Sequence, residues 1–235
     1  MAQHLKLIAL LIFTLSASYT SAQSLRKLLE RPYGIIESKW EKDAQVDNPF
    51  KSASSYTFYR GKFPKDFNIQ TPYALPVKNN QKTAWKTDPR EPFKTLNFHI
   101  KQGDTIYATR SGIACKTTNP QQLLIYHPDQ TFAAYLVMNE NFIEPGEEVQ
   151  VGQAIGKAGP TGGAISFFFL DENKFKGGLS SGYPYSHFIP VFRTTEGDVK
   201  PEEKTIYQAV TDHDLIMQDM SKRNKKKYMK LHNLK

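Results

Sequence analysis

The segment from Gly103 to Leu170 constrains the fold most, because short apolar runs alternate there with glycine-containing turns. Each run holds a few β-branched or aromatic residues between Gly, Pro, Asn or Asp, which is typical of antiparallel strands and hairpins. The last run contains Phe167, Phe168 and Phe169. Strand alternation directs Phe168 to one side and its two neighbours to the other. We therefore expect a mainly β protein with an antiparallel sheet or sandwich as its core.

Five short motifs follow one another along this segment. They are Gly103–Ala108 (GDTIYA), Ser111–Ala114, Ile125–His127, Tyr135–Met138 and the glycine-rich Ile143–Gly162, which ends in Thr-Gly. In this order they resemble the lysostaphin-type (LytM-like) zinc metallopeptidases, which cut peptide crosslinks in bacterial cell walls. The resemblance implies the duplicated-hybrid-motif β fold of that family, and the glycine-rich motif is its most specific part.

The resemblance also indicates where that family has its zinc ligands and catalytic histidines. A hydrolytic zinc site needs three protein ligands and an open position for water. Counted from Gly103 and from the Thr-Gly turn, the family's five positions are occupied here by Phe93, Asn97, Val137, Ala164 and Ser166. Asn is a poor zinc ligand, and Phe, Val and Ala are none. The sequence therefore predicts a degenerate peptidase domain, a pseudo-enzyme with no catalytic residue, metal or cofactor.

The groove inherited from the peptidase fold is then the place to look for a ligand. Exchange of its histidines and aspartate for Phe, Val and Ala makes it drier, which suits the side chains of a peptide or the strand of a partner protein. The groove-binding candidates are Asn97, His99, His127, Tyr135 and Ser166. For His127 a structural role, capping the turn at Pro128-Asp129, is the alternative.

Two other functions stay open at this point. One is an active cell-wall metallopeptidase with a relocated metal site built from His99, His127 and His187, although none of them has a typical ligand spacing. The other is a purely structural envelope protein. The favoured reading is a non-catalytic binding or regulatory module at the cell envelope. Its partner would be a peptidoglycan peptide or an envelope protein such as an amidase, because degenerate members of the wider family bind and activate wall amidases.

The N-terminus reads as a secretory signal. Residues 1–22 combine Lys6, an apolar run over Leu7–Leu15 and a small-residue cleavage site near Ala22. We expect an exported protein, periplasmic or extracellular. Residues 23–72 would form an extension that packs on the core and contains a short helix over Leu25–Glu30.

The remaining chain is expected to divide into three parts. Residues 73–175 would form the peptidase-like domain, with Thr83–Pro92 as a loop over the groove. Residues 176–210 would add a loop and a hairpin of Val191–Thr195 with Thr205–Val210. Residues 211–235 would be a basic helical tail with Thr211 as its N-cap.

The positive charge of the chain is concentrated in this tail. Residues 221–235 contain seven basic residues and no acid, against a formal net charge of +8 for the whole chain. Export argues against nucleic acid, so an anionic envelope surface is the expected partner. The candidate contacts are Lys222, Arg223, Lys225, Lys226 and Lys227. With Cys115 as its single cysteine, the chain forms no internal disulfide, and this residue is expected to be a small buried apolar group.

Overall fold

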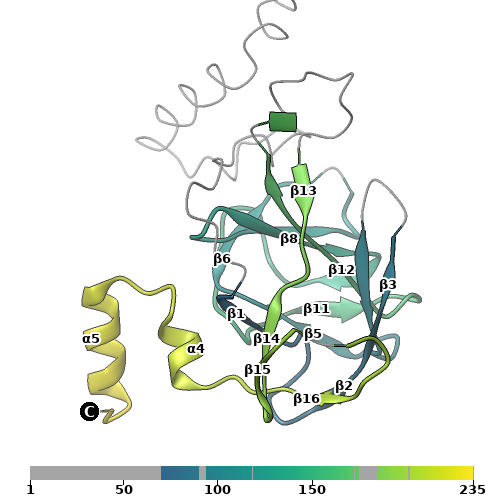
Figure 1. Cartoon of the computed structure of the whole chain (residues 1–235). Helices are drawn as coiled ribbons and strands as arrows, with labels where there is room; N and C mark the ends of the chain where they lie inside the picture. Colours follow the sequence, from purple (N-terminus) through teal and green to yellow (C-terminus); the bar gives the residue numbers. More distant parts are fainter. Residues whose placement is uncertain are drawn as a thin grey trace, which may run out of the picture. The chain divides into compact units, whose positions relative to one another are not determined.

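The computed structural model describes residues 70–89, 94–117, 119–171, 173–174, 185–200 and 202–234. The expected signal segment, the N-terminal extension with its Leu25–Glu30 helix, and Phe93 lie outside these residues. The described part is mainly β, as predicted, with antiparallel sheets and two C-terminal helices (Figure 1).

The largest sheet contains the strand pairs that position the candidate site. Its strand order is β10-β6-β7-β8-β12-β4-β3, and β13 also pairs with β12. The bounds are β3 Trp85–Asp88, β4 Thr95–Phe98, β6 Gly112–Cys115, β7 Leu123–Tyr126, β8 Thr131–Leu136, β10 Glu148–Val149, β12 Gly163–Leu170 and β13 Tyr185–His187. Every pairing in it is antiparallel. Two segments predicted as loops thus contain strands: β3 lies within Thr83–Pro92, and β13 in the segment after the core.

Three smaller sheets complete the described strands. They are β5 (Thr105–Tyr107), β11 (Ala154–Ala158) and β9 (Met138–Asn141); β1 (Pro72–Ala74), β14 (Val191–Thr194) and β15 (Gly197–Val199); and β16 (Tyr207–Gln208) with β2 (Lys82–Thr83). The predicted hairpin of Val191–Thr195 with Thr205–Val210 is present only as one antiparallel bridge, Thr194 with Ala209, and a hydrogen bond from the Thr195 amide to the Gln208 carbonyl. The chain already reverses between Thr194 and Gly197, where Thr194 Oγ1 donates to the Gly197 carbonyl, so β14 pairs with β15, and β16 pairs with β2.

The Phe-rich strand β12 separates two layers of side chains, which confirms the predicted alternation. Phe167 belongs to the main hydrophobic core and packs edge-on against Tyr73 and Phe192. Phe168 points to the other face and stacks on Phe132, with ring centroids 5.1 Å apart. Cys115 is a buried free thiol whose pKa is raised by its burial, which fits its expected role as a small apolar residue.

The outer strand β3 is not left as an open edge. The amide of Thr87 donates to Glu203 Oε1 (2.7 Å), and the amide of Lys204 donates to the carbonyl of Trp85 (3.0 Å). The segment around residues 203–204 therefore satisfies backbone groups that an edge strand would otherwise expose.

The basic tail forms two helices rather than one. Helix α4 (His213–Met217) begins after the N-cap Asp212, whose side chain accepts from the Leu215 amide. Helix α5 (Lys222–Leu231) begins after the N-cap Ser221. Asp212, and not the predicted Thr211, is thus the N-cap, and the Thr211 amide donates to Asn79 Oδ1.

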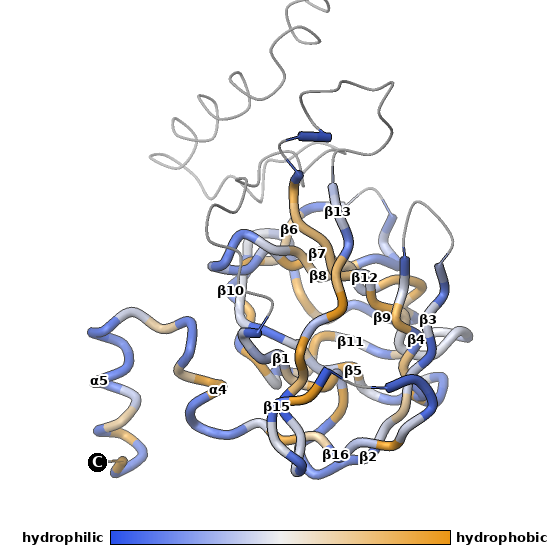
Figure 2. Tube along the Cα trace, viewed as in Figure 1, coloured by the Kyte–Doolittle hydropathy of each residue, from blue (hydrophilic) through white to orange (hydrophobic). Residues whose placement is uncertain are grey.

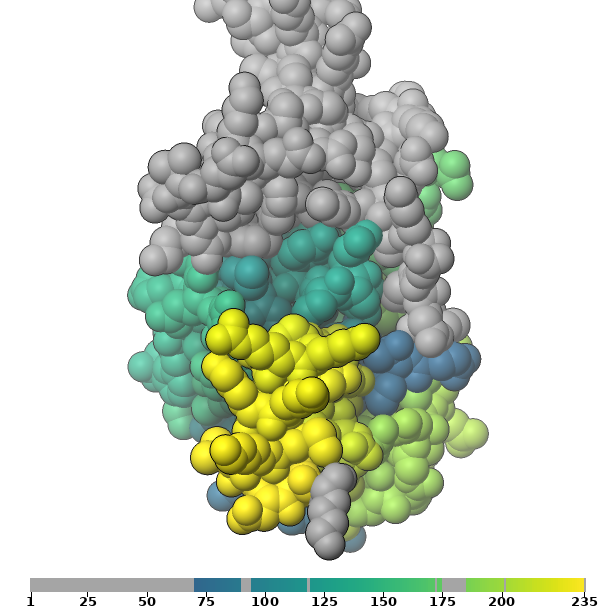
Figure 3. Space-filling model, turned by 90° about the vertical axis from the view of Figure 1, so that its left-hand side faces the viewer, coloured from purple at the N-terminus to yellow at the C-terminus, as the bar shows by residue number. Residues whose placement is uncertain are grey.

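The two helices differ in how they meet the domain. Leu215 of α4 is buried in a small cluster with Ala74 and Val151, whereas α5 has no buried residue and is largely hydrophilic (Figure 2). Both helices lie at the surface in the view of Figure 3. No helix among the described residues is long and apolar enough to cross a membrane.

Candidate functional site

Strands β4 and β12 bring three of the five expected peptidase positions together. Ala164 lies opposite Asn97 in the antiparallel register, and Ser166 follows two residues later on β12, opposite Thr95. Because alternate residues of a strand share a face, Asn97, Ala164 and Ser166 lie on the same face of the large sheet. Their arrangement is the one expected from the motif spacing.

Val137 lies directly after the end of β8 and has an unusual backbone. Its φ is 54° and its side chain is 39% exposed. A β-branched residue rarely adopts the left-handed region, so this turn is held by its surroundings. Gly159 packs directly against this turn, since a Cβ atom there would lie 1.9 Å from the Val137 carbonyl oxygen. The turn of residues 159–162, which leads into β12, can therefore approach Val137 closely.

The donor set on this face does not fit zinc. At the three aligned positions it consists of the Asn97 amide and the Ser166 hydroxyl, since Ala164 has no donor atom. Structural and catalytic zinc sites use Cys, His and carboxylate ligands. Within the described residues, no group of three or more His, Cys, Asp or Glu could hold a metal ion. The Oγ of Ser166 is buried and has no hydrogen-bond partner among the residues described here. No catalytic step follows from these side chains.

His127 was predicted to line the groove, and the structure corrects this. The side chain is 1% exposed, and its Nδ1–H donates to the Ser111 carbonyl (2.9 Å). Its ring also packs edge-on against Tyr73, on the side of the main core. Burial lowers the pKa of His127 to about 4, so the imidazole is neutral at pH 7. The local turn role is closer to what is observed, because the Gln130 amide donates to the His127 carbonyl.

This buried histidine predicts a loss of stability in mild acid. Its folded-state pKa lies below the unfolded value, so the unfolded chain binds more protons as the pH falls from about 6.5 to about 4. The free energy of unfolding should fall by about 2 kcal/mol between about pH 7 and about pH 5 on this account. His127→Asn, which keeps a donor for Ser111 but does not titrate, should flatten that slope in urea denaturation. The exposed control His99→Asn should retain it, and an unchanged slope in His127→Asn would contradict the assignment.

Tyr135, another predicted groove residue, lies in the main core. It is fully buried, and its hydroxyl accepts from the Thr109 amide (2.8 Å). Burial raises the pKa of Tyr135 to about 12. The physical reason for the error is strand parity: Tyr135 pairs with Ile165, so it points away from the face that carries Ser166.

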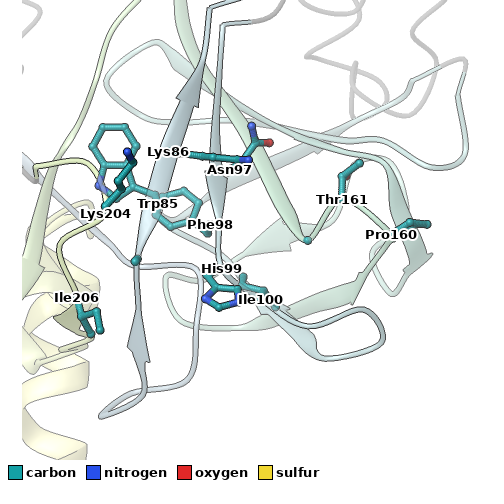
Figure 4. Close-up of a pocket in the computed structure, with 12 residues that line it drawn as sticks. Trp85, Lys86, Asn97, Phe98, His99, Ile100, Pro160, Thr161, Lys204 and Ile206 are labelled. Carbon is teal, nitrogen blue, oxygen red and sulfur yellow. The ribbon is translucent and has the colours of Figure 1, made fainter.

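The remaining candidates, Asn97 and His99, line a pocket of about 570 Å³ beside β3 and β4 (Figure 4). Pro160 and Thr161 form the opposite wall, and Lys86 and Lys204 also line it. Sequence reasoning missed both lysines. Lys86 lies on β3, in a segment predicted as a loop, although its neighbours Trp85 and Thr87 are residue types that are enriched in strands.

The three histidines of the alternative metal site have separate surroundings. His99 is exposed at the pocket and His127 is buried near Tyr73. His187 is on β13, where its ring packs against Phe168 and Tyr185. These contacts give no support to a metal centre shared by the three.

Comparison with known proteins finds one family whose model matches the same part of the chain. Residues 91–169 match the model of peptidase family M23. No curated protein is similar enough to count as a match. Among solved structures, the M23 metalloprotease Pseudoalterin from the deep sea is 14% identical over 41% of this chain and 68% of its own, with a TM-score of 0.35.

Two further structures are similar at the same level. The SpoIIQ–SpoIIIAH pore-forming complex contains a chain that is 20% identical over 42% of this chain and 82% of its own, with a TM-score of 0.30. Helicobacter pylori Csd3 is 21% identical over 41% of this chain and 29% of its own, with a TM-score of 0.29. Because these TM-scores are low, the likeness to the M23 family rests on the family model together with the observed strands. Residues 91–169 of this chain match peptidase family M23, and the described part of the chain has an M23 peptidase-like, mainly β fold.

Proposed function

We propose that this protein is a non-catalytic M23-type module that binds a peptide or a protein at the bacterial cell envelope. The observation that carries the proposal is the register of β4 and β12, which pairs Asn97 with Ala164 and puts Ser166 on the same face. These are positions at which the family resemblance expects zinc ligands and a catalytic histidine. The fold is retained while the side chains that would hold the metal are replaced.

The localisation, the partner and the domain bounds predicted from the sequence are part of this proposal. The chain is exported with cleavage near Ala22, and it acts in the periplasm or outside the cell. Its partner is a peptidoglycan peptide or an envelope protein such as an amidase. The peptidase-like part spans residues 73–175. The following part is tied closely to it, since β14 pairs with β1 and β16 pairs with β2.

Metal content and wall turnover test the proposal together. The full mature protein is loaded with excess zinc and dialysed, then measured by elemental analysis and incubated with crosslinked peptidoglycan. We expect no stoichiometric zinc and no release of wall fragments. The matched positive control restores the three ligands in one chain, Phe93→His with Asn97→Asp and Ser166→His, and should gain zinc. Stoichiometric zinc with wall turnover in the unaltered protein would establish the enzymatic alternative instead.

A second measurement separates a binding module from a purely structural protein. Purified cell wall is sedimented with the protein, and an envelope extract is passed over the immobilised protein. Specific recovery with either material supports the module. Recovery with neither, from protein that is folded by circular dichroism, favours the structural role.

The basic helix α5 provides a surface contact in this proposal. Lys222, Arg223, Lys226 and Lys227 are exposed and Lys225 is half-buried. The first turn of α5 has no acidic residue. Cations at a helix N-terminus oppose the helix dipole, so Lys222 and Arg223 do not serve the stability of the helix. An anionic surface is the natural partner for them.

Binding to anionic membranes should therefore depend on this charge. Exchange of all five residues for Gln is expected to weaken binding at least about ten-fold to vesicles with roughly one-third phosphatidylglycerol at low salt, since each basic residue near such a surface contributes about 1 kcal/mol. A cosedimentation assay measures the effect. The control exchanges the four lysines for Arg, which keeps the charge and should keep the binding. Equal binding by the Gln variant would show that α5 is not the contact.

A further inference from the structure

Val137 occupies the bend that carries the chain from the largest sheet into the sheet of β5, β11 and β9. The preceding residue, Leu136, ends β8 and lies opposite Ala164, whereas the following residue, Met138, begins β9 and is buried in the main core. The backbone of the bend is in close contact with Gly159, where a Cβ atom would meet the Val137 carbonyl. A residue at this point therefore has to accept a positive φ.

The backbone accounts for the positive φ of Val137 but not for the choice of valine. Gly and Asn adopt this conformation at lower cost than a β-branched residue does. Val137 is the one β-branched residue with a positive φ in the part of the chain that the structure describes. The other non-glycine residues with a positive φ there are Asn80, Gln130, Lys204 and Asn233. Strained residues of this kind cluster at active sites and ligand sites, so the valine side chain calls for a reason of its own.

Packing in the core does not supply this reason. The Val137 side chain is 39% exposed and is not part of the main core cluster. Val137 is instead at the position where the family resemblance expects a catalytic histidine. It follows the row that Leu136, Ala164 and Asn97 form across β8, β12 and β4. An exposed side chain at this place would lie beside a ligand held on that face of the sheet.

The exposed apolar surface at Val137 is small. Among the described residues, the other large hydrophobic side chains that are exposed belong to Phe142, Ile206 and Leu231. Val137 directly precedes β9 and Phe142 directly follows it, so the two are roughly 15 Å apart. The apolar core of a protein interface usually combines several large side chains, whereas a single exposed valine suits one small apolar group of a peptide.

We propose that Val137 is a specificity-determining residue of the inherited groove, where its side chain contacts a small apolar side chain of a bound peptide. The inference rests on the proposed function and specifies the chemistry of the ligand. It also explains why a strained valine is present at a bend that asparagine or glycine would form more easily.

Three substitutions of Val137 separate the contact from the strain. Val137→Asn removes the apolar surface and fits a positive φ, Val137→Thr keeps the shape and the strain but is more polar, and Val137→Ile keeps both the apolar surface and the β-branch. Each variant of the full mature protein is titrated with purified cell wall and recovered by sedimentation. We expect the Asn and Thr variants to bind about five-fold more weakly, through the loss of one apolar contact. The Ile variant should bind as the unaltered protein does.

Thermal unfolding of the same variants gives a readout that needs no ligand. Val137→Asn relieves the strain and should raise Tm by about 2–4 °C, whereas Val137→Thr keeps the strain and should leave Tm nearly unchanged. A lower Tm for Val137→Asn would show that the valine serves the packing of the bend, which overturns the inference.

The binding experiment distinguishes failure of this inference from failure of the proposed function. Wall binding by the unaltered protein together with equal binding by Val137→Asn overturns the role of Val137 alone. Absence of wall binding by the unaltered protein excludes a wall peptide as the ligand, so the proposed function fails for that ligand and the inference fails with it.

Discussion

Arg110→Met is expected to lower the free energy of unfolding by about 3–5 kcal/mol, the usual cost of removing one partner of a buried ion pair. The Arg110 side chain is 3% exposed and forms two parallel hydrogen bonds with Asp219, of 2.9 and 2.8 Å. It also pairs with Asp129, and its guanidinium lies over the ring of Tyr73. Loss of the guanidinium leaves two largely buried carboxylates without their cation.

The position of Asp219 gives this change a second, local effect. Asp219 lies between α4 and α5, so Arg110 fastens the junction of the two helices to the β domain. Hydrogen exchange in the C-terminal helices should accelerate in Arg110→Met. Urea denaturation measures the global effect, with Arg193→Met as the control.

Arg193 is a suitable control because it also pairs with two carboxylates, those of Asp198 and Asp212, which are 39% and 38% exposed. Solvent-exposed pairs contribute about 1 kcal/mol or less. The interpretation of Arg110 as a buried anchor fails if the two variants lose the same stability.

Gly159→Ala is expected to cost about 3 kcal/mol, at the upper end of the usual cost of overpacking. The added Cβ would lie 1.9 Å from the carbonyl oxygen and 3.0 Å from the carbonyl carbon of Val137. Both atoms belong to the backbone, so relief requires a shift of the turn between β8 and β9 and cannot come from a side-chain rotation.

The comparison variant is Gly197→Ala. Gly197 has a φ of 106°, but nothing lies within 4 Å of the added Cβ. Only backbone strain of about 1–2 kcal/mol is expected there. Thermal and urea denaturation of both variants would test the difference. A smaller loss for Gly159→Ala than for Gly197→Ala would show that the contact with Val137 is not rigid.

The local signals in the sequence located the strands well, whereas the pairing of Asn97 with Ala164 is visible only in the structure. Glycine turns and short apolar runs are local features, so β8, β11 and β12 lie where the pattern predicts them. The direction of individual side chains depends on which residues of two strands are paired, and this is set by tertiary packing. Tyr135 was assigned to the wrong face for this reason.

The pocket lysines and the buried His127 show a second limit of prediction from the sequence. Lys86 and Lys204 are far apart in the chain and line one pocket because residues 203–204 return to the edge of β3. His127 looked like a polar groove residue, but it is buried and its Nδ1–H donates to the Ser111 carbonyl inside the domain. A single sequence contains no signal for such long-range partners, because hydrogen bonds of this kind follow from the fold.

The covered edge of β3 limits how this protein can meet other chains. With the Thr87 amide bonded to Glu203 and the Trp85 carbonyl bonded to Lys204, an incoming strand would first have to displace these bonds. Sheet extension along this border is therefore disfavoured, both for aggregation with further copies and for a ligand peptide bound as an added strand. A ligand on this side has to be recognised by side chains of the protein. The chemical groups of the ligand, rather than the length of its backbone, would then determine selectivity.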